Sequence, residues 1–381
     1  MGAATAYFPV QGQCDERFAG VRAAFDNNLR QGFDVGASVA ITIDGELVVD
    51  LWGGAADAAR TTPWRSDTLV TVFSTTKTMT ALTALFLADQ GELDLDAPIA
   101  RYWPEFAAAG KEGVLVRHAL GHTAGLPTWD EQLAFDDIFD WDKVCGLLAR
   151  QAPWWTPGTA SGYHALTQGY LVGEVVRRIT GQTLGTFFAR ELAAPLGGDF
   201  YIGLPPSEDH RVSLGVLPAN PEEPASGPGS IGMKVHLNPG LLREKTWEEG
   251  WRRAEIPAGN GFGNARSIAR IQSLLACGGD VNGRRIMSRA GCEAVFQQQS
   301  DGPDLAFLAP VRFGMGYALS SMGLPVPRGR RVCLWGGSGG SLIIVDFDAR
   351  MTFAYAMNQL EGSPFADKRG QALVAATFVA L

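Results

Sequence analysis

Runs of residues with strand character lie at both ends of the chain. Residues 37–43 and 46–52 are two such runs, and Asp44-Gly45 between them is typical of a two-residue hairpin turn. Three more runs of this type lie near the other end, at 331–335, 341–347 and 351–357. We therefore expect antiparallel strands from both ends of the chain.

Apolar residues at helical spacing mark a second class of segment. They recur at 15–30 and again, close to the end, at 367–381. The region from about 75 to 200 is dominated by this pattern, with helices predicted at 74–90 and 166–180. Gly91 and Gly181 follow these two segments, and glycine is the usual residue just beyond a helix.

These patterns predict an α+β fold, with an antiparallel sheet flanked by terminal helices and an inserted, mostly helical domain. The sheet domain is expected to be discontinuous, from residues 1–75 and 245–381, and the helical domain to span 76–244. Residues 203–240 are rich in proline and glycine, which favours a long loop there.

Composition excludes several classes of protein. The 381 residues are 46% hydrophobic and 19% charged, which is far from the composition of a disordered chain. The net charge of −8, without a Lys/Arg-rich run, argues against binding nucleic acid. No apolar run approaches the ~18 residues of a membrane span, and no secretion signal is evident. We therefore expect a cytoplasmic protein with no membrane association.

The pair Ser74 and Lys77 is the first candidate for chemistry. An apolar run, 69–73, leads into Ser74, and an apolar helix is predicted to start there. Residues three apart share one face of a helix, so the lysine amine can reach the serine hydroxyl. A desolvated lysine has a lowered pKa and can take the proton of a serine nucleophile. The spacing is also compatible with an N-capping serine and a solvated lysine.

Two further segments favour the catalytic interpretation of Ser74 and Lys77 over the N-capping one. Tyr163 lies in residues 157–165, just before a predicted helix, and the glycine-rich segment 335–341 follows a predicted strand. With Ser74 and Lys77, these segments make the chain resemble the penicillin-recognising serine hydrolases. Within that group it is most similar to the family VIII carboxylesterases, along nearly its whole length. Segments 91–98, 118–127 and 169–181 carry the same resemblance.

The resemblance implies a role for each of these positions. Ser74 would be the nucleophile, Lys77 its base partner, and Tyr163 the phenol that passes a proton to the leaving group. The backbone N–H groups of Ser74 and Ser338 would form the oxyanion hole. No metal or cofactor is implied.

Departures from the β-lactamase pattern bear on the substrate. Ala165 stands where the lactamases carry an asparagine, and Trp335 replaces the lysine of their third motif. Both changes favour neutral esters over β-lactams, which carry a carboxylate. We expect the substrate-binding residues to be Trp335, Gly336, Gly337, His164 and Trp129.

Two other patterns suggest different chemistry. Ser338 lies in a G-x-S-x-G sequence, as in α/β-hydrolases, but a strand-like run follows it and no histidine occurs after His236. His118 and His122 are four residues apart, yet no third metal ligand is evident, so we expect structural histidines. Five scattered cysteines without C-x-x-C spacing indicate buried thiols.

The sequence thus predicts a serine carboxylesterase that hydrolyses short-chain esters through an acyl-enzyme on Ser74, with a small ester as its partner molecule. The alternatives are a β-lactamase or D-amino-acid peptidase of the same fold, and a catalytically silent member that acts as a binding or scaffold protein. The sequence makes no prediction of oligomeric state.

Overall fold

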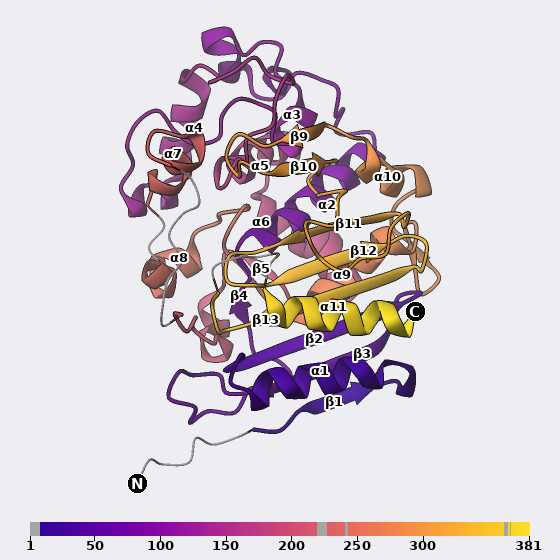
Figure 1. The fold of residues 1–381 in the computed structure, drawn as a ribbon. Coiled ribbons are helices and arrows are strands. Elements are labelled where there is room, and N and C mark those ends of the chain that lie inside the picture. Colours follow the sequence, from indigo (N-terminus) through magenta and orange to yellow (C-terminus); the bar gives the residue numbers. More distant parts are fainter. Residues whose placement is uncertain (1–7, 219–226, 241–242, 362–364, 366) are drawn as a thin grey trace.

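The computed structural model describes residues 8–218, 227–240, 243–361, 365 and 367–381 (Figure 1). Its strands are β1 (Gln11–Cys14), β2 (Gly36–Ile43), β3 (Glu46–Gly54), β4 (Val70–Thr71), β5 (Tyr201–Ile202), β6 (Gly261–Gly263), β7 (Asp280–Val281), β8 (Arg284–Arg285), β9 (Ser300–Pro303), β10 (Pro310–Phe313), β11 (Val332–Gly336), β12 (Leu342–Asp346) and β13 (Met351–Met357). Its α-helices are α1 (Ala19–Arg30), α2 (Thr76–Asp89), α3 (Val116–Leu120), α4 (Trp141–Arg150), α5 (Thr167–Thr180), α6 (Leu184–Phe188), α7 (Ile231–Leu237), α8 (Glu249–Arg253), α9 (Ala265–Ala276), α10 (Arg289–Glu293) and α11 (Lys368–Ala380).

The main sheet joins the two ends of the chain. Its strand order is β1-β3-β2-β13-β12-β11, and every neighbouring pair is antiparallel. β2 and β13 pair along their whole length, from Ala37 opposite Met357 to Ile43 opposite Met351. Between β2 and β3, Asp44 and Gly45 both have positive φ, as the hairpin turn requires. The predicted α+β fold, with a sheet built from both ends, is therefore confirmed.

Each strand of the sheet sends alternate side chains to opposite faces. On β12, for example, Leu342 and Ile344 belong to the core under α1 and α11, whereas Ile343 and Val345 face α9. Figure 1 shows α1 and α11 together on one face and α9 on the other. Strands β2, β12 and β13 are buried along nearly their whole length, because both of their faces lie against a core.

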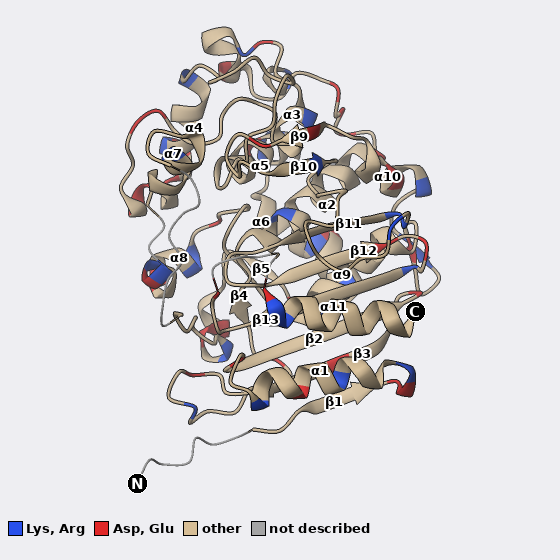
Figure 2. Cartoon of the chain, viewed as in Figure 1, with Lys and Arg blue, Asp and Glu red and all other residues tan. Residues whose placement is uncertain are grey.

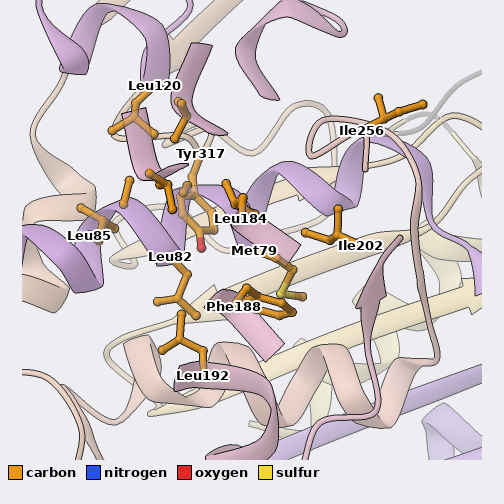
Figure 3. Close-up of a cluster of buried hydrophobic side chains, with 14 of the residues drawn as sticks. Met79, Leu82, Leu85, Leu120, Leu184, Phe188, Leu192, Ile202, Ile256 and Tyr317 are labelled. Atoms are coloured by element: carbon orange, nitrogen blue, oxygen red, sulfur yellow. The ribbon is translucent and has the colours of Figure 1, made fainter. Parts of the chain in front are cut away.

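Helix α2 lies at the centre of the mostly helical part of the molecule. Eleven of its residues are buried, and apolar side chains surround it on all sides. Figure 3 shows Met79, Leu82 and Leu85 of α2 among side chains from α3, α6, β5 and the loops. Because this core continues onto the α9 face of the sheet, it does not separate the two expected domains. The division into 1–75 with 245–381 and 76–244 stays a prediction.

The described part of segment 203–240 contains two short helices that its composition did not predict. One is a 3-10 helix, Pro206–Arg211, and the other is α7, whose start is capped by the Ser230 hydroxyl. Residues 219–226 of this segment lie outside the described residues. In the described part of the chain, no helix combines the length and apolar character needed to cross a membrane.

Candidate active site

Ser74 lies at the junction between strand β4 and helix α2. A single 3-10 turn, Phe73–Thr75, precedes α2, and Phe73 adopts a positive φ of 46°. A positive φ is rare for a bulky residue, and such strained positions are concentrated at functional sites. The Ser74 N–H has no hydrogen-bond acceptor among the residues that the structure describes. The turn therefore presents a half-buried hydroxyl beside a free N–H group.

Lys77, in the first turn of α2, is completely buried. Its Nζ lies 2.6 Å from the Ala165 carbonyl oxygen, 2.8 Å from that of Ala258 and 3.3 Å from Ser74 Oγ. Desolvation lowers the pKa of this amine well below its usual value. A neutral amine has two hydrogens and one lone pair. In the neutral form the two carbonyls accept these hydrogens, which leaves the lone pair for the Ser74 hydroxyl.

Tyr163, in the loop before α5, is the third member of the group with Ser74 and Lys77. Its hydroxyl donates to Ser74 Oγ at 2.7 Å. Its ring stacks on Phe307, with centroids 4.6 Å apart, and its backbone N–H donates to the buried Asp304 carboxylate at 3.1 Å. Burial raises the pKa of the phenol, while hydrogen bonding to Ser74 and the nearby Trp335 indole oppose that rise. The phenol is therefore protonated at neutral pH.

Trp335, Gly336 and Gly337 lie at the end of β11, which is the edge strand of the main sheet. Trp335 is 2% exposed. Aromatic rings surround it, with centroids 5.4 to 6.3 Å away, from Tyr163, Phe365, Phe313, His122 and Phe307. Its indole Nε1 is buried and lacks a hydrogen-bond partner within the described part of the chain. It approaches the Tyr163 hydroxyl without reaching hydrogen-bond geometry.

The turn after β11 carries Ser338. Within the described residues, the Ser338 N–H donates to no acceptor. The preceding residue, Gly337, packs so closely on the loop before Ser74 that an added Cβ would lie 2.1 Å from the Val72 carbonyl oxygen. The Ser338 hydroxyl accepts a hydrogen bond from Arg243 at 3.4 Å. The structure thus brings the turn against the Ser74 segment and leaves both predicted oxyanion-hole N–H groups unoccupied.

Two of the predicted substrate-binding residues are engaged elsewhere. His164 is fully buried, and the Leu126 N–H donates to its Nε2 at 3.1 Å. Its Nδ1 therefore carries the hydrogen and donates to the Gly162 carbonyl at 2.5 Å. Burial lowers the pKa of His164 to about 3, so the ring is neutral. Neither ring nitrogen is free for a substrate, and the structure assigns His164 a structural position instead.

Trp129 lies in the core that contains α2. It is 1% exposed, packs edge-on against Tyr170 and donates its indole N–H to the Val144 carbonyl at 3.0 Å. It does not belong to the aromatic group around Trp335. The expectation that Trp129 contacts the substrate therefore has no support in the contacts that it makes.

The competing patterns also have structural explanations. The turn containing Ser338 leads into strand β12 and not into a helix, which differs from the nucleophile elbow of α/β-hydrolases. His118 Nδ1 accepts from the backbone N–H of Leu115, and His122 Nδ1 accepts from the backbone N–H of His164. The two histidines therefore have different partners and do not form a shared site. No cluster of three or more potential metal ligands occurs among the described residues. All five cysteines are free thiols, and four of them are buried.

Several residues of the site have no sequence signature that we recognised. Phe307 and Asp304 hold Tyr163 from a loop 141 residues or more further along the chain. The strand edge lacks the lysine that β-lactamases carry there, but Arg243 places a guanidinium beside Ser338. These residues follow no short motif, because their positions relative to Ser74 depend on the tertiary fold.

The arrangement of helix, serine, lysine, tyrosine and strand edge defines a penicillin-recognising type of hydrolase fold. The β-lactamase family model matches residues 25–377, and the chain belongs to that family. The resemblance to family VIII carboxylesterases is likewise confirmed, because the chain is 42% identical to a crystal structure of one. The match covers 98% of this chain and 100% of that chain, with a TM-score of 0.91.

Other relatives bear different names. A penicillin-binding protein homologue from Caulobacter crescentus is 36% identical, with a TM-score of 0.90 over 98% of this chain and 100% of that chain. The esterase/beta-lactamase LipL of Mycobacterium tuberculosis is 35% identical over 92% of this chain and 83% of its own length.

Proposed function

We propose that the protein is a serine carboxylesterase that forms an acyl-enzyme on Ser74. The observation that carries this proposal is the contact of one half-buried hydroxyl with both a desolvated amine and a phenol. The carboxylesterase title of one relative and the esterase name of LipL support the same activity.

In the acylation step, Ser74 Oγ attacks the ester carbonyl carbon and its proton passes to the lone pair of Lys77. The carbonyl oxygen becomes an oxyanion, which accepts hydrogen bonds from the N–H groups of Ser74 and Ser338. The carbon–oxygen bond to the alcohol then breaks, and the alkoxide leaves with the Tyr163 proton. Tyr163 regains a proton from Lys77, so the two groups titrate as a coupled pair.

Deacylation repeats these steps with water. The water loses its proton to the neutral Lys77 amine as it attacks the acyl carbon, and Lys77 then returns that proton to Ser74 Oγ as the acyl–oxygen bond breaks. The products are a carboxylic acid and the free enzyme. Every group required is present in the chain, so the mechanism calls for no cofactor.

Neutral short-chain esters suit this site best. Ala165 provides no side-chain hydrogen bond, and its backbone carbonyl is taken by Lys77. The strand edge presents the Trp335 ring in place of a cation, within a group of aromatic side chains. Trp335, Gly336 and Gly337 therefore stay our candidates for substrate contact. A cytoplasmic location stays a prediction from the sequence.

Replacing the nucleophile tests the proposal. Ser74→Ala should abolish hydrolysis of p-nitrophenyl butyrate and labelling by a fluorophosphonate probe, with an unchanged circular dichroism spectrum. Ser338→Ala is the control, because it keeps the backbone N–H and should retain labelling. Full activity in Ser74→Ala together with its loss in Ser338→Ala would overturn the assignment. An absence of labelling and turnover in the wild-type protein would favour a silent binding member.

A β-lactamase or D-amino-acid peptidase activity is the second candidate. The observation in its favour is that LipL carries both the esterase and the β-lactamase name. A steady-state comparison of p-nitrophenyl butyrate, a cephalosporin and a D-alanyl peptide separates the two. We expect the ester to have the highest kcat/KM.

A further inference from the structure

The two expected donors of the oxyanion hole lie on separate segments of the chain. Ser74 precedes α2, whereas Ser338 follows β11, 264 residues later. Within the described part of the chain, no backbone hydrogen bond joins residues 72–76 to the turn at 337–341. The distance between the two N–H groups therefore depends on the close packing of Gly337 against Val72 and on side-chain hydrogen bonds.

The hydroxyl of Ser341 makes that connection. Ser341 is 1% exposed and lies at the end of the turn, just before β12. Its Oγ donates to the Val72 carbonyl at 2.7 Å and lies 2.9 Å from Thr75 Oγ1. Because the single hydroxyl hydrogen of Ser341 goes to the carbonyl, Thr75 is the donor in the second bond.

The same residue also closes its own turn. The Gly337 N–H donates to the Ser341 carbonyl at 2.8 Å, so the backbone of Ser341 holds the turn while its side chain holds the Ser74 segment. Val72 and Thr75 flank Ser74 on either side. A shift of the turn relative to Ser74 therefore breaks two buried hydrogen bonds.

We propose that Ser341, together with Thr75, is a positioning residue that sets the spacing between the Ser74 and Ser338 N–H groups. The inference rests on the proposed function. An oxyanion hole works only when its donors lie about 2.7–3.1 Å from the developing oxyanion. Ser341 contacts neither substrate nor the reacting atoms in this scheme, and it acts through the backbone.

Removing the Ser341 hydroxyl should therefore weaken stabilisation of the transition state more than binding of the substrate. Removing a whole oxyanion donor lowers kcat by about 10²–10³-fold, so displacing one should lower it by about 10–100-fold. The ground-state carbonyl carries less charge, and KM should change little. A role limited to stability would leave kcat of the folded protein unchanged.

The chain offers a matched control for Ser341→Ala. Thr352, on β13, is also buried, and its hydroxyl lies 2.6 Å from Thr42 Oγ1 and 3.0 Å from the Ala269 carbonyl. Thr352→Ala therefore removes the same pair of bonds, hydroxyl and carbonyl, at a place outside the site. Both variants should unfold at lower urea concentration than the wild type.

The test compares kcat, KM and inhibitor affinity for p-nitrophenyl butyrate hydrolysis in the two variants. In Ser341→Ala we expect kcat to fall about 10–100-fold, and affinity for an alkylboronic acid to fall in parallel. Affinity for the product butyrate should hold within about twofold. Thr352→Ala should keep kcat within about twofold. Equal kcat values in the two variants would overturn the inference.

A second variant keeps the test informative if Ser341→Ala does not fold. Thr75→Val preserves the shape of the side chain and removes its hydrogen bond to Ser341, so kcat should fall several-fold, whereas Thr75→Ser should restore it. Unchanged kcat in Thr75→Val would then count against the role. Failure of the proposed function has a different signature, namely no fluorophosphonate labelling of Ser74 in the wild-type protein.

Discussion

Replacing Lys77 by methionine should change how the stability of the protein depends on pH. In the native state, burial lowers the pKa of Lys77 far below its usual value of 10.5. In the unfolded state the amine returns to that usual value. Between the two pKa values the unfolded chain binds one proton that the native protein does not bind. The free energy of unfolding therefore rises with pH across this window.

The size of this pH dependence follows from the difference of one bound proton between the unfolded and native states. A difference of one bound proton corresponds to about 1.4 kcal/mol per pH unit. Lys77→Met removes this titration, so the stability of the wild type relative to the variant should rise by about that amount per unit. The gain should be seen at every pH above the native pKa of Lys77 and below 10.5. The phenol of Tyr163 stays protonated in this range, and burial, the largest cause of the lowered pKa values of His122 and His164, acts in both proteins.

Lys111 provides the control for this measurement. It is also fully buried, but its Nζ lies within hydrogen-bond distance of three carbonyl oxygens, from Ala108, Ala149 and Gln151. Three acceptors use all three hydrogens of an ammonium group, and the pKa of Lys111 falls only to about 8. Lys111→Met should therefore show almost no pH dependence relative to wild type between about pH 6 and pH 7.

Urea unfolding followed by tryptophan fluorescence at several pH values between about 6 and 7 measures both differences. We expect a slope for Lys77→Met and a flat line for Lys111→Met. A flat line for both variants would mean that Lys77 is protonated in the native protein. That result would refute the assignment of its lone pair to the Ser74 proton.

Two further substitutions test the strand edge. Trp335→Phe keeps an aromatic ring but removes the indole N–H, which lies near the Tyr163 hydroxyl and offsets part of the rise that burial causes in the pKa of Tyr163, so kcat for p-nitrophenyl butyrate should fall several-fold; an unchanged kcat would show that the N–H has no role in turnover. Gly337→Ala should lower kcat by about 100-fold or more with the fold retained by circular dichroism, because the new Cβ would lie 2.1 Å from the Val72 carbonyl oxygen and force the turn away. Gly113→Ala, where an added Cβ meets nothing within 4 Å, is its control, and equal rates in these two glycine variants would contradict this reasoning.

The sequence predicts best those parts of the fold whose conformation depends on residues close together along the chain. The hairpin at Asp44-Gly45 and the helix end at Gly181 each require a backbone conformation that those residues favour. β1 was missed because it is a short, mostly exposed edge strand of polar residues, without an alternating pattern. Helix α7 was missed because proline and glycine in the surrounding segment concealed its start at Ser230.

The same distinction applies to the site. The three-residue spacing of Ser74 and Lys77 is a local property of a helix, and the structure brings both to Tyr163 as the motifs indicated. The carbonyls that hold Lys77 lie 88 and 181 residues away along the chain, so no local pattern indicates them. His164 shows the converse: its residue type suggests chemistry, but backbone groups already occupy both ring nitrogens.

Trp335 stands at the strand edge where the β-lactamases carry a lysine, and we expect this difference to affect substrate charge more than substrate size. A carboxylate that enters the site loses its hydration, and only a cation or several strong donors offset that cost. The Trp335 ring is neutral and its indole N–H is buried, so the strand edge brings no charge that would offset this cost. Arg243 does bring a positive charge to the turn, but its guanidinium already donates to the Ser338 hydroxyl and the Glu361 carbonyl. We therefore expect the proposed preference for neutral esters to persist when the acyl chain is varied.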